Sequence, residues 1–187
     1  NYIERIFSLE SVGCKDWLTN KVDRCVGGKV AKQQCVGELQ LPLNNCGVMA
    51  LDYSTKHGVA TSIGHSPVSA LIDPNAGSKN SIAEALTNII WAPIENGLKG
   101  VSLSANWMWP CKNEGEDARL YKAVESVSKF AIELGINIPT GKDSLSMNQK
   151  YENLEVKSPG TVIVSATAHC NNISNIIEPV FKLDKGS

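Results

Sequence analysis

The sequence predicts an α+β fold, in which a mixed β-sheet of about four or five strands is covered on one face by two long helices. Short apolar runs of strand length alternate along the chain with two longer stretches of helical periodicity. A turn signal between two neighbouring runs predicts a hairpin, and therefore at least one antiparallel pair. We interpret four runs as the clearest strands: 46–53, 58–63, 101–109 and 160–169.

The first predicted helix has its core at residues 83–90 and ends before Pro93. Asp73 followed by Pro74 is typical of an N-cap and first helical position, because the N–H that proline lacks would be unpaired there anyway. Further along, apolar residues recur at the spacing i, i+3, i+4 and i+7, which predicts one buried face. These residues are Ile82, Ala85, Leu86 and Ile89.

The second predicted helix covers residues 116–134. Its apolar positions form one stripe, acidic residues suit its positive N-terminal end, and Gly135 is a natural residue to follow its last turn. Residues 30–42 are interpreted as a strand interrupted at Gly37, and residues 56–58 as the hairpin turn. Residues 136–147 are expected to form a loop around Gly141.

Composition narrows the classes of protein to consider. The chain has 187 residues, 42% of them apolar, and a formal net charge of −1. The absence of a basic patch argues against nucleic acid as a partner. Six scattered cysteines without a CxxC pair favour reduced thiols in a cytoplasmic protein. No apolar run approaches the roughly 18 residues of a membrane span, so no membrane partner is expected.

Two polar side chains on the first helix form a candidate cation site. Glu84 and Asn88 are one helical turn apart, so their side chains lie one above the other. Two hard oxygen donors in this arrangement can share one small cation. The alternative is an ordinary solvated pair, and the spacing alone does not decide between them.

Two further segments could attract phosphate. Residues 140–144, Thr-Gly-Lys-Asp-Ser, combine a glycine with a lysine and hydroxyls, but they lack the GxxxxGK[ST] pattern of a Walker A loop. Lys15, Lys21 and Arg24 precede a Gly-Gly turn. In each case an ordinary polar turn is the alternative. Trp107 and Trp109 are interpreted as core or interface residues rather than as a stacking platform.

Five segments, taken together and in order, carry a resemblance to a known family: VGCKDWLTNKVDR, QQCVGELQLPL, LIDPN with AEALTNII, SANWMWPCKNEGE and GKDSLSM. They resemble the large form of formylglycinamide ribonucleotide amidotransferase, also called phosphoribosylformylglycinamidine synthase. The match covers a central slice of such an enzyme, from Ser8 to about His169. It is similar to the N-terminal half of the second of two repeats related to aminoimidazole ribonucleotide synthetase.

The resemblance implies a fragment of an ATP-dependent ligase of de novo purine biosynthesis. Such an enzyme converts formylglycinamide ribonucleotide plus glutamine to formylglycinamidine ribonucleotide, by phosphorylating the amide oxygen and displacing the phosphate with ammonia. The glutaminase part, with its nucleophilic cysteine, lies elsewhere in these enzymes. No residue of this chain is therefore expected to be catalytic, and the fragment alone is expected to be inactive.

By the same resemblance, Lys15 and Asn44 match positions that contact the nucleotide, and Asn45, Glu84 and Asn88 match magnesium ligands. The implied cofactors are ATP or ADP with Mg²⁺. The family usually has an aspartate where Asn45 stands, and an amide supplies oxygen without charge. The last metal-ligating aspartate of the family belongs to the following half-domain. We therefore expect this part to supply half of an auxiliary nucleotide–Mg²⁺ site.

The resemblance also implies a domain division and partners. Residues 1–28 would be a lead-in segment containing Lys15, residues 29–169 the half-domain, and residues 170–187 a linker or the start of the following half-domain. The partners would be the rest of the same polypeptide, with the fragment itself pairing as a homodimer through an apolar sheet face. The alternative is a purely structural or dimerisation module with a degenerate nucleotide site.

Overall fold

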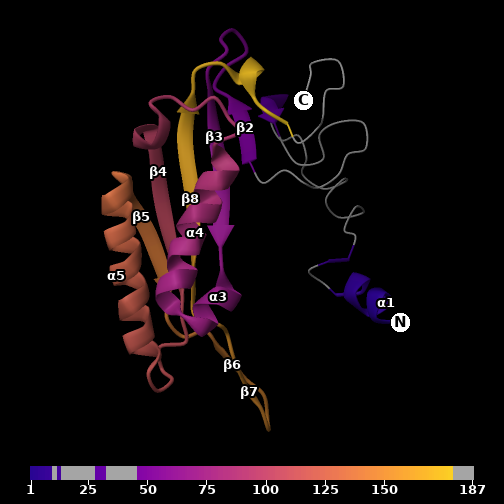
Figure 1. The fold of residues 1–187 in the computed structure, drawn as a ribbon, viewed down its shortest axis with the longest axis vertical. Coiled ribbons are helices and arrows are strands. Elements are labelled where there is room, and N and C mark those ends of the chain that lie inside the picture. Colours follow the sequence, from indigo (N-terminus) through magenta and orange to yellow (C-terminus); the bar gives the residue numbers. More distant parts are fainter. Residues whose placement is uncertain (10–11, 14–27, 33–45, 179–187) are drawn as a thin grey trace.

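The computed structural model describes residues 1–9, 12–13, 28–32 and 46–178. Its main feature is a six-stranded sheet in the order β1-β2-β3-β8-β4-β5, wider than the four or five strands expected (Figure 1). Two more short strands, β6 (Asn148–Lys150) and β7 (Glu155–Lys157), form a separate ribbon. The strands of the main sheet are β1 (Val30–Lys32), β2 (Cys46–Ala50), β3 (Gly58–His65), β4 (Val101–Met108), β5 (Asn137–Ser144) and β8 (Thr161–Cys170).

The strand pairing confirms a mixed sheet. β2 and β3 pair antiparallel, as the hairpin prediction requires, and β8 lies antiparallel between β3 and β4. β4 and β5 run parallel, and the chain passes from one to the other through α5 (Glu116–Leu134). The hairpin turn is longer than expected. It is held by the Asp52 carboxylate, which accepts hydrogen bonds from the backbone N–H groups of Ser54 and Thr55.

Two long helices cover one face of the sheet, which confirms the predicted fold class. α4 (Pro74–Ile89) packs on β3 and β8, and α5 packs beside α4 and against β5 (Figure 1). A single core contains buried residues of both helices and alternate residues of the central strands. The short helix α3 (Pro67–Ile72) packs against α4. The described part also contains α1 (Tyr2–Phe7) and the 3₁₀ turns η2 (Gly97–Gly100) and η3 (Ile173–Asn175).

The start and the buried face of α4 agree with the sequence prediction. The Asp73 side chain accepts a hydrogen bond of 2.9 Å from the backbone N–H of Asn75, and Pro74 is the first helical residue. All four predicted apolar positions are buried. The helix is longer than the predicted core at residues 83–90, because it continues back through a stretch of small and polar residues to the cap.

One glycine lets α4 lie directly on the sheet. A Cβ atom at Gly64 of β3 would lie 2.1 Å from the backbone oxygen of Ser81 and 2.4 Å from the backbone nitrogen of Ala85. Two residues earlier in β3, the Ser62 hydroxyl donates a hydrogen bond of 2.6 Å to the carbonyl of Ala85. Helix and strand backbones therefore touch here, and this contact fixes where the polar side chains of α4 stand relative to β3.

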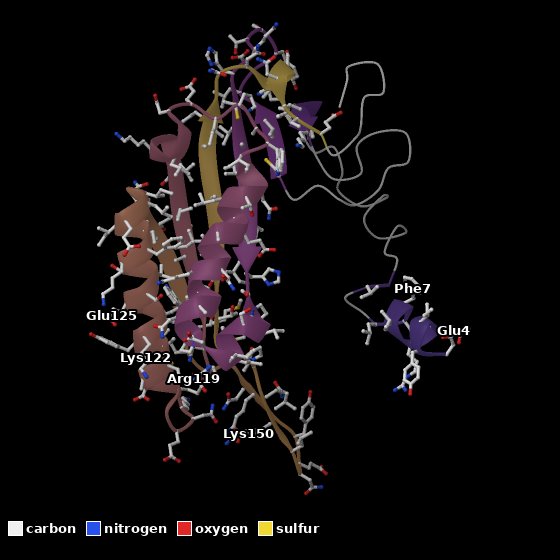
Figure 2. All side chains as sticks on the ribbon, in the orientation of Figure 1. Glu4, Phe7, Arg119, Lys122, Glu125 and Lys150 are labelled. Carbon is white, nitrogen blue, oxygen red and sulfur yellow. The ribbon has the colours of Figure 1, made fainter. Side chains whose placement is uncertain are left out.

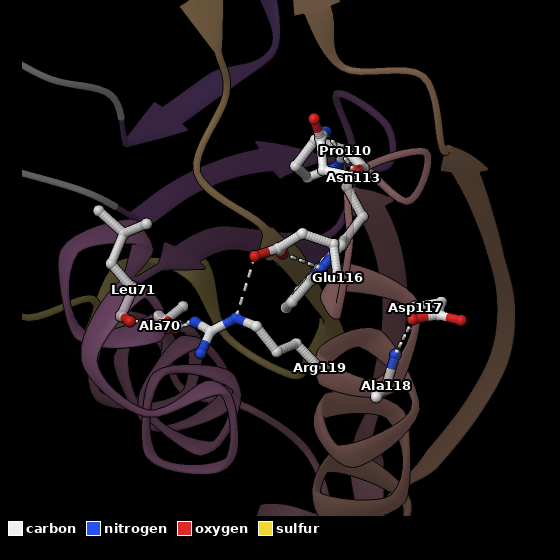
Figure 3. Close-up of polar contacts among 9 residues, drawn as sticks. Ala70, Leu71, Pro110, Asn113, Glu116, Asp117, Ala118 and Arg119 are labelled. Carbon is white, nitrogen blue, oxygen red and sulfur yellow. Dashed lines mark hydrogen bonds and ion pairs between the residues drawn. The ribbon is translucent and has the colours of Figure 1, made fainter.

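A polar network joins α3, α5 and the end of β4 (Figure 3). The Glu116 carboxylate accepts a hydrogen bond of 2.9 Å from the indole N–H of the fully buried Trp109, and it pairs with Arg119 at 3.3 Å. Arg119 also donates to the carbonyls of Ala70 and Leu71, at 2.6 and 3.0 Å. Trp109 is thus a core residue, as predicted, and Arg119 supplies partners for carbonyls that the end of α3 leaves unpaired.

The predicted loop at residues 136–147 is wrong, because most of it forms β5. β5 is an edge strand and is largely exposed, so it lacks the apolar alternation that reveals strands in a sequence. An edge also tolerates Pro139, and the register shifts near this residue. Gly141, interpreted as a loop glycine, instead lies against β4, where a Cβ atom would be 2.3 Å from the Ala105 oxygen.

The sheet face opposite the helices is less apolar than expected. The pairing register places hydroxyl and amide side chains along this face at the centre of the sheet. Isoleucines and methionines lie among them, so the face is mixed in character rather than a bare apolar surface. Its polar members include Thr61, Thr167, Ser102, Ser104, Ser165 and Asn106.

The chain after β8 packs back onto the domain. Ile173 and Ile176 lie against the core, and the backbone N–H of Ile177 donates to the carbonyl of Trp91. The domain boundary near residue 169 stays a prediction. The three cysteines in the described ranges are free thiols. None of the described helices combines the length and apolar character that a membrane span requires.

Candidate functional site

The candidate site lies at the end of β3, beyond the part of this strand that the described residues of β2 pair with. The last residue pair of the two strands joins Cys46 to Ser62, so within the described ranges β2 gives no partner to the residues from Ile63 to His65. Two side chains of α4 form hydrogen bonds with the backbone of β3 here. Glu84 Oε2 accepts a hydrogen bond of 2.6 Å from the backbone N–H of His65, and Asn88 Nδ2 donates one of 2.9 Å to the carbonyl of Ile63.

This arrangement leaves one oxygen on each side chain outside the two bonds. Glu84 contacts the strand through Oε2, and Asn88 contacts it through its nitrogen. Glu84 Oε1 and Asn88 Oδ1 are therefore the atoms that could face a ligand. Both side chains are partly buried, and they lie one turn apart on α4 as their spacing predicts. An ordinary solvated Glu–Asn pair therefore does not fully describe these residues, because each side chain also forms a hydrogen bond with the backbone of β3.

A cavity of about 640 Å³ opens beside Glu84, and Asn88 is not among its lining residues. Glu84 is the one residue of α4 among its lining residues, which otherwise come from four strands of the sheet. The cavity includes the start of β2 at Cys46 and the exposed edge of β3 at His65. Its full lining is Val30, Lys32, Cys46, Gly47, Val48, Met49, Thr61, Ser62, Ile63, His65, Glu84, Ser165 and Thr167.

Lys32 is a buried cation in the wall of this cavity that the sequence reasoning missed. Its side chain is 3% exposed, and its Nζ donates a hydrogen bond to the carbonyl of Ile177. Burial lowers the pKa of Lys32, and burial raises the pKa of the neighbouring Cys46 thiol. Both shifts favour the neutral forms. A lone lysine in a three-residue strand carries no local sequence signal of burial, and its hydrogen-bond partner lies 145 positions along the chain.

Three of the five residues singled out from the sequence lie outside the described residues: Lys15, Asn44 and Asn45. Glu84 and Asn88 are therefore the part of the expected site that the geometry can address. The described ranges contain no group of three or more His, Cys, Asp or Glu side chains able to hold a metal ion. One carboxylate and one amide suit a hard cation, but Mg²⁺ takes about six oxygen ligands. The pair can form only part of such a shell.

The second predicted phosphate segment lies elsewhere. Lys142 is on β5, and its Nζ donates a hydrogen bond of 2.5 Å to the Ser144 hydroxyl. Its backbone pairs with Asn106 of β4, so its side chain stands on the face without helices. β8 and β4 lie between β5 and β3, a separation of about 14 Å at the usual strand spacing. The structure does not bring Lys142 together with Glu84.

Solved structures share this architecture. The fold matches PurLQS from Thermotoga maritima with a TM-score of 0.65 and 15% identity. This match covers 91% of this chain and 28% of the PurLQS chain. PurL from T. maritima, in a complex with ADP, matches over 90% of this chain and 25% of its own, with a TM-score of 0.63 and 16% identity. At this level of identity the likeness defines the class of fold, that of PurM-like domains.

The sequence comparison identifies the family. Residues 14–169 match the FGAR-AT PurM_N-like domain, and the chain belongs to this family. It is 46% identical over 185 residues to a probable phosphoribosylformylglycinamidine synthase of Caenorhabditis elegans, and 43% identical over 184 residues to the phosphoribosylformylglycinamidine synthase of Homo sapiens. These matches cover 99% and 98% of this chain but 14% of each relative. The chain thus spans about one seventh of the length of these relatives.

Proposed function

We propose that the chain is a segment of an ATP-dependent ligase of purine biosynthesis that converts formylglycinamide ribonucleotide and glutamine to formylglycinamidine ribonucleotide. The support is its membership of the FGAR-AT PurM_N-like domain family and its 43–46% identity to phosphoribosylformylglycinamidine synthases. In this proposal the rest of the same polypeptide supplies the reaction chemistry, and the protein acts in the cytoplasm.

Within that ligase, the cavity beside Glu84 would be half of an auxiliary nucleotide–Mg²⁺ site. The observation that carries this proposal is the pair of oxygens, Glu84 Oε1 and Asn88 Oδ1, that the hydrogen bonds to β3 leave available. Asn44, Asn45 and Lys15 lie outside the described residues, so their part in the proposal rests on the family resemblance alone. On that basis, Asn44 is proposed to contact the nucleotide, Asn45 the cation, and Lys15 the phosphates.

The charge balance supports an incomplete site rather than a self-sufficient one. Mg²⁺ with a nucleotide needs oxygen ligands and compensating charge, and Glu84 is the one carboxylate that this set provides. A further acid from the following half-domain would complete the cation shell. The chain alone is accordingly expected to bind nucleotide weakly or not at all, and the site belongs to the intact polypeptide.

A structural role is the second candidate, and one observation favours it. Glu84 and Asn88 already have partners in the backbone of β3, so they complete the sheet edge without any ligand. In this alternative the site is degenerate, and the sheet serves contact with a sister repeat or a second copy. The mixed, hydroxyl-rich sheet face gives homodimerisation less apolar driving force than was expected from the sequence.

Two substitutions at one position separate the candidates. Glu84→Gln removes the charge but keeps a carbonyl oxygen that can accept from His65, whereas Glu84→Ala removes both. The readout is the nucleotide retained by the purified full-length protein after desalting, with Thr87→Ser on the same turn as control. A charge-assisted ligand contributes about 1.5–3 kcal/mol, so we expect Glu84→Gln to weaken nucleotide binding about 10- to 150-fold. Unchanged retention in Glu84→Gln, with lower stability only in Glu84→Ala, would instead establish the structural role.

A further inference from the structure

The β6–β7 ribbon projects from one end of the sheet (Figures 1 and 2). Its base is firmly attached to the loop that follows β4. The backbone N–H of Cys111 donates to the carbonyl of Leu145 at 3.1 Å, and Asn113 Nδ2 donates to Asn148 Oδ1 at 3.1 Å. Beyond this base the two strands continue away from the core. The ribbon is therefore an arm with a defined direction, not a loosely tethered loop.

The two faces of the ribbon differ in chemistry. Its register pairs Gln149 with Val156, and the backbone N–H of Tyr151 donates to the carbonyl of Leu154. Because side chains alternate along a strand, these four residues share one face. The opposite face is entirely polar and consists of Asn148, Lys150, Glu155 and Lys157. The ribbon thus has the pattern of a strand pair with one buried face, although no described element covers that face.

The apolar side chains of this face are open to solvent. Tyr151 and Leu154 are each 62% exposed, and Val156 is 47% exposed. An isolated two-stranded hairpin is marginally stable in water, and packing of its apolar face is what usually stabilises it. An anchored, amphipathic arm with three exposed apolar side chains is therefore a candidate contact surface.

We propose that the apolar ribbon face (Gln149, Tyr151, Leu154 and Val156) is an interdomain contact, covered by an apolar surface of the same polypeptide beyond residues 1–187. This inference rests on the proposed function, in which the chain is a segment of a longer ligase. Its relatives extend well past the matched part, since the match covers 14% of their length. Most of such a polypeptide is therefore available to pack against the arm.

The size of the face favours this occupant over a second copy of the chain. Aromatic side chains bury about 150–250 Å² and full burial of Leu or Val removes about 60–120 Å². With the exposed fractions of these three side chains, the face offers about 160–290 Å² for burial. A stable interface between separate molecules buries about 800 Å² per partner. A contact within one chain needs less, because covalent connection supplies a high effective concentration.

Hydroxyl-radical footprinting of the full-length protein tests the proposal. The oxidation rates of Tyr151 and Leu154 are compared between the native and the urea-unfolded protein. Without a cover, their exposure limits protection to about twofold, whereas burial in an interface should slow oxidation about fivefold or more. Protection of twofold or less would overturn the proposal. Protection that disappears on dilution would also overturn it, because that result identifies a second copy as the occupant.

A pair of double variants supplies the matched control. Tyr151→Ser with Leu154→Ser removes apolar area, and Lys150→Ser with Lys157→Ser changes the opposite face of the same ribbon. The first should lower the melting temperature of the full-length protein by a few degrees and the second by about 1 °C or less. Equal shifts would overturn the proposal. The nucleotide retained by the full-length protein is measured in parallel. Loss of nucleotide in Glu84→Gln tests only the proposed function, whereas protection of the ribbon from oxidation tests only the proposed ribbon contact.

Discussion

Gly64→Ala is expected to destabilise the chain strongly, because α4 rests on this glycine. The added Cβ would lie 2.1 Å from the Ser81 oxygen, whereas ordinary contact begins near 3.4 Å, so the helix or the strand must move by more than 1 Å. The contacted atoms belong to a helix backbone, which cannot rotate away. Overpacking typically costs about 1–3 kcal/mol, and we expect a loss of about 2–3 kcal/mol in the free energy of unfolding.

Gly47→Ala in the adjacent strand β2 is the matched control. Its Cβ would meet the Thr61 hydroxyl at 3.6 Å, an ordinary contact. The control should be neutral or stabilising by about 0.4–1 kcal/mol, since alanine restricts the unfolded chain. Urea denaturation followed by far-UV circular dichroism measures both variants. The amide of His65 should also exchange faster in Gly64→Ala, because Glu84 moves with the helix. Equal stabilities of the two variants would refute the packing argument.

Arg119→Met should cost about 1–3 kcal/mol in urea denaturation and speed amide exchange in α3, because the carbonyls of Ala70 and Leu71 lose their donor; an unchanged midpoint would contradict this. The backbone N–H of Asn75 lowers the pKa of Asp73, so the cap stabilises the fold above the unfolded pKa and fails as pH falls through the folded pKa. Asp73→Asn should therefore flatten the acid limb of melting temperature against pH, and an identical limb would count against it. Burial lowers the pKa of Lys32, so the unfolded chain binds more protons at pH values between the folded and the unfolded pKa of this lysine, and stability should rise with pH across that window. Lys32→Met should abolish that rise, and a variant with the same slope would show that the amine is not responsible.

The helices could be predicted from the sequence because their signals are local. The cap at Asp73 and the buried stripe of α4 depend on residues within a few turns of one another. The same holds for α5, where Gly135 adopts the left-handed conformation, with φ of 68°, that ends a helix. The apolar runs of β2, β3, β4 and β8 were found because these strands supply the buried core.

The features that were missed depend on pairing between distant segments. β5 was not predicted, because an exposed edge strand has little apolar patterning and because its proline and glycine are typical of a loop. The spacing of Glu84 and Asn88 indicated two neighbouring oxygen donors. Their bonds to β3 could not be predicted, because they depend on how α4 packs on residues of β3 that lie beyond its described pairing with β2. The hydrogen bond of the Lys32 amine likewise depends on Ile177, 145 positions away.

In the proposed site, Glu84 and Asn88 each keep one oxygen for a cation that accompanies a nucleotide. The most direct measurement is electron paramagnetic resonance of Mn²⁺, in place of Mg²⁺, bound to the full-length protein with ATP. The wild type and the Thr87→Ser control should bind the same number of ions per polypeptide. Glu84→Gln should bind one fewer at the same free Mn²⁺ concentration while its melting temperature stays close to that of the wild type. An unchanged number of bound ions in Glu84→Gln would show that Glu84 is not a ligand of the cation.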